Sequence, residues 1–293
     1  MNISTRVSNS AAPAGAFTFV ELLVIVAMLG LGALMLAPAL ARTKTISPTF
    51  QCMNNLGQLQ HACAMYAADN AGRLAPNLGK FTYNYSAWCN GVLDWGLGYG
   101  SGSLGESLPP NVNTNYLVKS LLGPYVARNP SYYRCPADKF PSAVGSRVRS
   151  YSMNAFVGAA DNTLSTTYSY GLTYRLFQKD SDLTKPGPSM TWVLTEEHPD
   201  SINDCYLVVD MPAASTWPTY TPWQDLPASP HNNAGCLSFA DGHVEAHQWV
   251  DAQTLAPVLK LTQWQAGVPG LNGYGTTSTH DSAWLIARTS APK

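Results

Sequence analysis

The sequence predicts an α+β fold, in which a long N-terminal helix packs against a small antiparallel β-sheet with long loops. An apolar segment begins at Phe17 and passes into an amphipathic pattern that ends near residue 75. Short β-rich runs follow it, which are typical of strands. Glycine and proline are frequent, with 23 and 21 residues in a chain of 293, and this predicts long loops between those strands.

The composition excludes some classes of function. The formal net charge is −1 and only 12% of the residues are charged. A nucleic-acid-binding protein presents a basic surface to the phosphates, so we expect no nucleic-acid partner. The chain is long enough to bury a hydrophobic core, and its many glycines, prolines and aromatic residues favour an exported, loop-rich protein.

The apolar segment predicts a membrane-spanning helix. No charged residue occurs from Leu22 to Ala41, and a helix of that length rises about 30 Å, the thickness of the hydrocarbon core of a bilayer. Glu21 stands at the start of this run, where burying a carboxylate costs a few kcal/mol, which predicts a functional role. A secretory signal cleaved near Ala37-Pro38-Ala39 and a plain signal anchor are the alternatives, and neither accounts for Glu21.

Residues 42–75 are predicted to continue the helix outside the membrane. An apolar face recurs every three or four positions, which is typical of a helix lying on a core. This face consists of Met53, Leu56, Leu59, Cys63 and Tyr66. Pro38 and Pro48 are expected to kink or interrupt the helix.

The segment Gly15-Ala16-Phe17-Thr18-Phe19-Val20-Glu21-Leu22-Leu23 resembles the type IV prepilin signal, in which a peptidase cuts just before a phenylalanine and the fifth mature residue is glutamate. The resemblance implies that residues 1–16 are a leader peptide and that cleavage falls between Ala16 and Phe17. It also implies N-methylation of Phe17, a transmembrane and assembly helix over 17–41, and a role for Glu21 in assembly. A lipid-buried carboxylate seeks a cationic partner, and the new α-amino group of a neighbouring subunit supplies one.

Residues 76–293 are predicted to form the exported α+β domain. The β-rich runs lie at 149–156, 167–177, 190–195, 205–209, 236–239 and 243–249. The last two are expected to form a hairpin, because Asp241-Gly242 between them supplies the positive φ angles of a tight turn. Short helices are predicted at 116–127 and 253–260, and an irregular tail from 265.

A second resemblance concerns the C-terminal part. His231 and Asp241-Gly242 match the H-x9-DG pattern of a large group of prepilin-like proteins from planctomycetes and verrucomicrobia. Segments 133–138, 149–154 and 192–198 are similar to that group too, so the resemblance covers residues 15 to about 250.

The two resemblances together imply a pseudopilin-type structural subunit that assembles into a short filament or a type II secretion pseudopilus. Its partners would be itself, related pseudopilins, the prepilin peptidase and an inner-membrane assembly platform. The precursor would lie in the inner membrane and the exported domain in the periplasm or at the cell surface.

Polar residues near the C-terminus are candidate metal ligands: Glu197, His198, Asp200, His231, Asp241 and His243. Carboxylates suit calcium, whereas histidines mixed with carboxylates suit zinc. The alternative is a polar network that locks the hairpin turn, with His231 hydrogen-bonded to the backbone of that turn. No other cofactor is expected.

We do not expect an enzyme. The chain contains no GxSxG, HExxH or glycine-rich phosphate loop. Glu196 and Glu197 are adjacent, so in a strand their side chains point to opposite faces and do not share a site.

The aromatic residues suggest an alternative function, a membrane-anchored or secreted glycan-binding protein of the cell surface. Trp95 and Trp223 lie in loop-rich stretches, where exposed rings can stack on sugars or on a protein partner. Packing in the core is the competing interpretation.

The six cysteines leave two possibilities open, disulfides or burial as small apolar residues. One pairing is excluded, because Cys52 and Cys63 lie about 16 Å apart along the predicted helix. No CxxC motif occurs.

Overall fold

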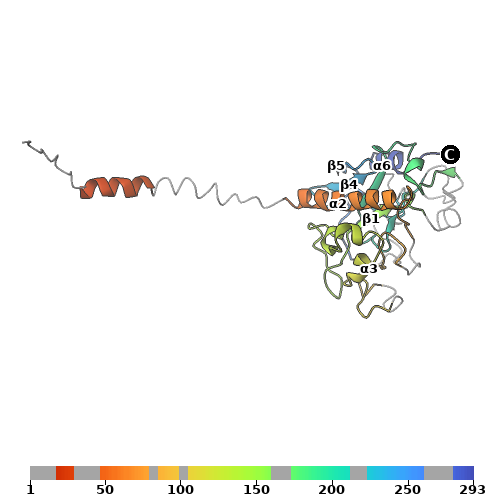
Figure 1. Ribbon diagram of the computed structural model, residues 1–293, viewed down its shortest axis with the longest axis horizontal. Helices are drawn as coiled ribbons and strands as arrows, with labels where there is room; N and C mark the ends of the chain where they lie inside the picture. Colours follow the sequence, from red (N-terminus) through yellow and green to blue (C-terminus); the bar gives the residue numbers. More distant parts are fainter. Residues whose placement is uncertain are drawn as a thin grey trace, which may run out of the picture. The chain divides into compact units, whose positions relative to one another are not determined.

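A computed structural model describes residues 18–29, 47–78, 85–98, 105–159, 173–211, 223–260 and 280–293. The chain divides into two units, Met1–Ile46 and Ser47–Lys293, each of which is described by itself (Figure 1). The predicted leader 1–16 and residues 30–46 of the predicted helix lie outside the described residues.

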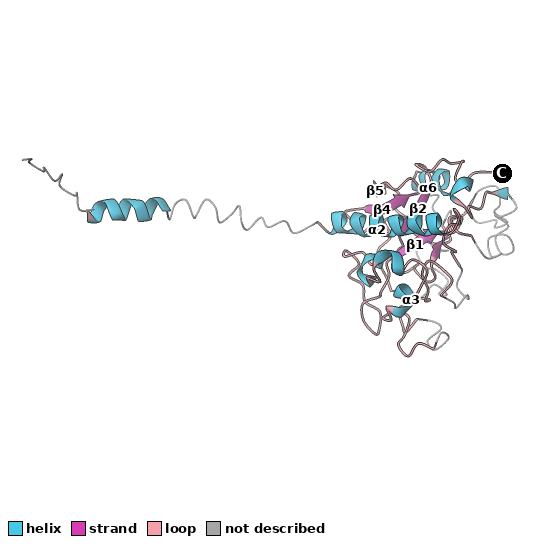
Figure 2. Cartoon of the chain, viewed as in Figure 1, coloured by secondary structure: helices cyan, strands magenta, loops and turns pink. Residues whose placement is uncertain are grey.

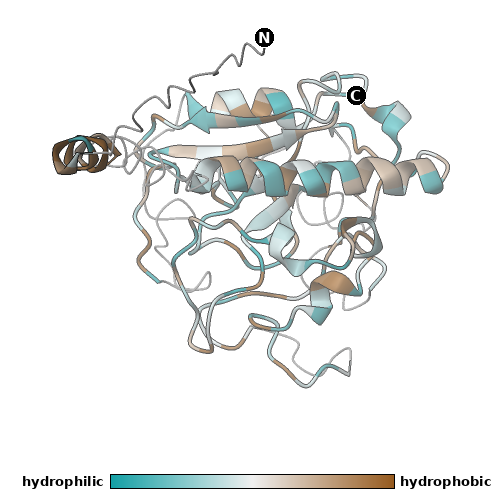
Figure 3. Cartoon of the chain, turned by 60° about the vertical axis from the view of Figure 1, so that its left-hand side comes forward, coloured by the Kyte–Doolittle hydropathy of each residue, from teal (hydrophilic) through white to brown (hydrophobic). Residues whose placement is uncertain are grey.

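In the first unit, residues 19–29 form a helix. It is almost uniformly hydrophobic in Figure 3, and its large side chains are exposed, for example Phe19 at 76% and Leu29 at 69%. Thr18 and Glu21 cap its first turn with reciprocal hydrogen bonds. Within the described part of the chain, no helix has both the length and the apolar character needed to cross a bilayer.

The second unit is α+β, as predicted, and is built on a five-stranded sheet of order β3-β1-β2-β4-β5. The strands are β1 (Tyr151–Asn154), β2 (Trp192–Glu196), β3 (Tyr206–Leu207), β4 (Ala234–Phe239) and β5 (Val244–Gln248). The neighbours β1–β2, β2–β4 and β4–β5 pair antiparallel, but β1 and β3 pair parallel. The sheet is therefore mixed, and the prediction of a purely antiparallel sheet was wrong. The reason is that β3 comes back from β2 to the far side of β1 and so runs in the direction of β1.

The helix α2 (Pro48–Asp69) lies across one face of this sheet (Figure 2) and packs against β4 and β5. Pro48 occupies its first turn, where the missing N–H has no partner to lose. Leu56, Leu59 and Cys63 are buried on the predicted apolar face, which is thus confirmed. Shorter helices are α3 (Asn115–Val118), α6 (Asp281–Thr289) and the 3₁₀ turns Pro124–Val126, Pro130–Tyr133 and Asp180–Asp182.

Both faces of the sheet are covered, and each has its own core. Successive residues of a strand point to opposite faces, so Tyr206 and Cys236 contribute to the core under α2. Their neighbours Leu207 and Leu237 contribute to a second core together with Leu285 of α6. This arrangement places Cys236 beneath α2.

The hairpin was predicted correctly, but two helix predictions were wrong. Strands β4 and β5 are joined through Asp241-Gly242, where Gly242 has a φ of 99°. Residues 253–260 contain turns and no helix, and the predicted irregular tail contains α6. The predicted helix 116–127 is divided between α3 and a 3₁₀ turn. Of the predicted strand 167–177, residues 167–172 lie outside the described residues, and within 173–177 Tyr174 and Phe177 each form an isolated bridge.

One buried carboxylate, that of Glu106, organises the loop before α3, and it predicts how the stability of the protein depends on pH. Glu106 accepts hydrogen bonds at 2.6 Å from the amide of Asn115, the ammonium of Lys119 and the hydroxyl of Tyr85. The bonds from Asn115, Lys119 and Tyr85 lower the pKa of Glu106 to about 2 from its ordinary 4.5. Its stabilisation is therefore present above about pH 4.5 and is lost as the pH falls towards 2.

Glu106→Gln is expected to lower the free energy of unfolding by about 1–2 kcal/mol at neutral pH, because the new amide presents N–H groups to three donors. Urea denaturation of variant and wild type between pH 7 and pH 3.5 measures this. The difference between the two proteins should shrink as the pH falls. A difference in stability that stays constant between pH 7 and pH 3.5 would contradict the assignment of this stabilisation to the ionised carboxylate of Glu106.

Candidate metal centre

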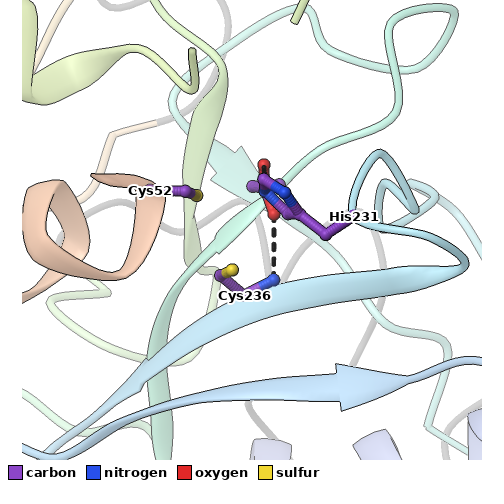
Figure 4. A group of neighbouring side chains, drawn as sticks. Cys52, His231 and Cys236 are labelled. Carbon is purple, nitrogen blue, oxygen red and sulfur yellow. Dashed lines mark hydrogen bonds and ion pairs between the residues drawn. The ribbon is translucent and has the colours of Figure 1, made fainter. Parts of the chain in front are cut away.

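Four ionisable side chains meet beneath the N-terminal half of α2: Cys52, Glu196, His231 and Cys236, here called the Cys/His/Glu cluster. One sulfur, nitrogen or oxygen atom from each lies within 4.8 Å of the others, and all four residues are buried. Figure 4 shows Cys52 reaching from α2, Cys236 from β4 and His231 from the preceding loop into a shared space. The cluster thus joins the helix to the sheet.

Regular secondary structure positions three of the four residues. Cys52 lies on the buried face of α2, just over one turn after Pro48. Cys236 points to the same side because of the alternation along β4. Glu196 ends β2, the neighbour of β4, and its Oε2 accepts a hydrogen bond of 2.9 Å from the backbone N–H of Cys236.

A tight turn positions His231 just before β4. The backbone groups of His231 and Ala234 exchange hydrogen bonds of 3.2 Å across Asn232 and Asn233, whose φ angles are 55° and 66°. Two consecutive positive φ angles define a type I′ turn, and asparagine tolerates this conformation better than most residues. The turn directs the imidazole towards α2.

The two ring nitrogens of His231 have different surroundings. Nε2 lies 3.0 Å from Oε1 of Glu196 and 3.4 Å from the sulfur of Cys135. Nδ1 lies 3.2 Å from the hydroxyl of Thr49 on α2. Burial opposes protonation, but hydrogen bonds with Cys135, Cys236 and Glu196 and the charge of Glu196 outweigh it and raise the pKa of His231 to about 12.

The two thiols of the cluster differ in acidity. A hydrogen bond from Cys52 lowers the pKa of Cys236 against the effect of burial, and His231 lowers it further. Burial raises the pKa of Cys52 well above its ordinary value, and its hydrogen bonds with Cys135 and Cys236 act in the same direction. Cys236 is therefore the more readily formed thiolate, the form of cysteine that binds metals.

A cavity of about 250 Å³ borders the cluster. Cys135 and Glu196 form part of its wall, and Pro199, Pro230 and Pro257 are among the residues on its other sides. Of the four cluster residues, Glu196 is the one that lines this cavity.

Of the six predicted metal ligands, only His231 belongs to the Cys/His/Glu cluster. Asp241 and His243 pair with each other in the exposed β4–β5 turn, with Oδ1 and Nδ1 2.6 Å apart. Cys52, Glu196 and Cys236 were missed. The alternative role for His231, bonding to the Asp241-Gly242 turn, was also wrong, because its side chain contacts Glu196, Cys135 and Thr49.

The remaining predicted ligands have other partners. Glu197 accepts hydrogen bonds from Ser152 at 2.5 Å and Ser201 at 2.7 Å, and burial raises its pKa to about 8. His198 contacts the carbonyl oxygen of Ala256 at 3.0 Å. Glu196 and Glu197 thus bond to different groups, although both line the cavity of about 250 Å³.

The structure also shows the surroundings of Asp200 and of the two predicted glycan contacts, Trp95 and Trp223. Asp200 accepts a hydrogen bond of 2.9 Å from the indole N–H of Trp95, and the guanidinium of Arg147 lies 4.5 Å from the centre of that ring. Trp223 is fully buried in the second core. The prediction that Trp223 contacts a glycan at the surface is therefore wrong, because its ring packs against the sheet.

The cysteines are buried as free thiols, one of the two predicted alternatives. The processing residues Ala16 and Phe17 lie outside the described residues, and Glu21 lies in the first turn of the helix 19–29. Searches among protein-family models, curated proteins and solved structures found no match for the chain.

Proposed function

We propose that this chain is a pseudopilin-type structural subunit. Its precursor is inserted in the inner membrane, cut between Ala16 and Phe17 by a prepilin peptidase, and assembled through its N-terminal helix into a short filament or secretion pseudopilus. The observation that carries the proposal is the placement of Glu21 in the first turn of an apolar helix, within the segment that resembles a prepilin signal.

The surface of this helix supports the proposal. Leu22 and Val26 are 55% and 60% exposed, and Phe19 and Met28 are more exposed still. Large apolar side chains gathered on one short helix need lipid or other apolar helices around them. A bundle of identical helices in and above a membrane provides both.

Glu21 has a local role that must be separated from assembly. Its Oε2 accepts hydrogen bonds of 2.9 Å from the backbone N–H and the hydroxyl of Thr18, and its own N–H donates to that hydroxyl at 3.3 Å. This arrangement is a capping box, which glutamine at the position of Glu21 can also form. Only the charge of Glu21, not its cap, would pair with the α-amino group of a neighbouring subunit.

Two variants separate the roles. Glu21→Gln keeps the cap and removes the charge, so it is expected to abolish assembly while membrane insertion persists. Thr18→Ala removes most of the cap and keeps the charge, so it should assemble. The measurement is cross-linking and sedimentation of sheared filaments from cells that express the full chain with a prepilin peptidase, with terminal-peptide mass spectrometry to establish cleavage before Phe17. Normal assembly of Glu21→Gln would refute the proposed mechanism.

The glycan-binding alternative is not favoured by the described residues. Trp223 is buried, and Trp95 is held by Asp200 and covered by Arg147.

A further inference from the structure

We infer that the Cys/His/Glu cluster binds a single zinc ion, which fastens α2 to strands β2 and β4. The inference rests on the described exported unit alone, and it is independent of how the N-terminal helix assembles. The ligands would be the sulfurs of Cys52 and Cys236, Nε2 of His231 and a carboxylate oxygen of Glu196.

The size of the cluster suits a tetrahedral ion. Zinc holds sulfur at about 2.3 Å and nitrogen or oxygen at about 2.0–2.2 Å, so neighbouring ligand atoms are about 3–4 Å apart. The four ligand atoms already lie within 4.8 Å of one another, and Nε2 of His231 and Oε1 of Glu196 are 3.0 Å apart. Small shifts of the four side chains are enough to bring these atoms to the spacing found around a zinc ion.

The donor types select zinc among the common divalent ions. Calcium and magnesium bind oxygen ligands almost exclusively, and two sulfurs exclude them. Thiolates together with an imidazole are typical of structural zinc sites. The carboxylate of Glu196 completes four ligands in a space closed to bulk water, since the Glu196 side chain is only 1% exposed.

Hydrogen bonds position three of the four ligands, and two of these bonds come from residues outside the cluster, Thr49 and Tyr151. The hydroxyl of Thr49 fixes Nδ1 of His231, which leaves Nε2 for the metal. The N–H of Cys236 fixes one oxygen of Glu196 and leaves the other. The hydroxyl of Tyr151 donates to the sulfur of Cys52 at 3.2 Å.

A disulfide is the main rival explanation. Cys52 hydrogen-bonds both Cys135 and Cys236, so oxidation could join it to either. A disulfide would use only two of the thiols and would not involve His231 and Glu196. These two buried side chains already pair with each other at 3.0 Å, and a metal ion would bind both of them together with Cys52 and Cys236.

The test is the zinc content of the full-length protein, purified in detergent, incubated with zinc chloride and desalted. We expect about one zinc ion per chain in the wild type. Cys52→Ser and Cys236→Ser should lose it. Cys63→Ser is the matched control, because Cys63 is buried on the same helix but lies outside the cluster. It should retain the wild-type zinc content.

Cobalt substitution of the wild-type protein gives a readout that does not depend on whether a variant folds. Cobalt bound by two thiolates in a tetrahedron produces a sulfur-to-metal charge-transfer band and intense visible bands. Metal-free wild-type protein, a cobalt complex without the charge-transfer band, or equal zinc in Cys52→Ser and wild type would each overturn the inference. So would thiol titration that shows Cys52 in a disulfide.

Discussion

Replacing Arg149 with methionine is expected to lower the free energy of unfolding by about 3–5 kcal/mol. Arg149 is fully buried. Its guanidinium donates to the carbonyl oxygens of Tyr151 at 2.8 Å and Asp204 at 2.5 Å, and to the hydroxyl of Ser152 at 3.0 Å. Methionine fills much of the same volume but donates no hydrogen bond. Each buried carbonyl left without its donor costs about 1–3 kcal/mol.

The hydroxyl of Ser152 connects this guanidinium to a second buried ionisable group, Glu197. It donates to Glu197, whose carboxylate is thereby linked to Arg149 through a single side chain. Removing the positive charge makes ionisation of Glu197 still less favourable. The double variant Arg149→Met/Glu197→Gln should therefore be less destabilised than the sum of the two single variants, by about 1–3 kcal/mol.

Urea denaturation of the purified full chain measures these differences. Arg128→Met is the control, because Arg128 is exposed and loses a single hydrogen bond, to the carbonyl oxygen of Val118, so its substitution should lower stability by about 1 kcal/mol at most. Arg149→Lys should not restore stability, because one ammonium cannot reach all three acceptors of the planar guanidinium. Wild-type stability of Arg149→Met would show that the buried network contributes nothing.

Local patterns predicted those parts of the fold that are specified by neighbouring residues. The apolar face of α2 follows a helical period within one segment, and the Asp241-Gly242 turn is encoded by two adjacent residues. The parallel pairing of β3 with β1 depends on where the chain returns after β2, which no local pattern contains. Helix α6 was missed because its short apolar run, Trp284 to Ile286, gains its stability from packing on the second core.

The candidate metal centre was accessible to sequence reasoning only through His231. Its ligands come from α2, the end of β2, the turn before β4 and β4 itself, so no compact spacing motif joins them. The predicted ligands were chosen because they were near one another in the sequence. The hairpin separates His231 from Asp241, since the six residues of β4 lie between them and divide the base of the hairpin from its tip. The six cysteines could have pointed to sulfur ligands, but they were interpreted as disulfides or as buried apolar residues.

The second large effect is expected from Gly158→Ala, which should lower the free energy of unfolding by about 3–5 kcal/mol. Gly158 has a φ of 64°, and a Cβ atom there would lie 2.1 Å from the carbonyl oxygen of Ala75. The same glycine accepts a hydrogen bond from the N–H of Asn77 and donates one to Phe177, both of 2.8 Å. The backbone therefore cannot move aside without breaking the contacts that hold these three segments together.

Gly105→Ala isolates the part of this effect that comes from backbone conformation. Gly105 has a similar φ of 71°, but no atom of the described residues lies within 4 Å of the position of its added Cβ. It should lose only about 1–2 kcal/mol, the cost of a left-handed conformation for an L-residue. Thermal and urea denaturation of both variants measure the difference. Equal losses would mean that the segment around Ala75 yields to the methyl group, and that close packing at Gly158 does not determine the path of the chain from α2 into the sheet.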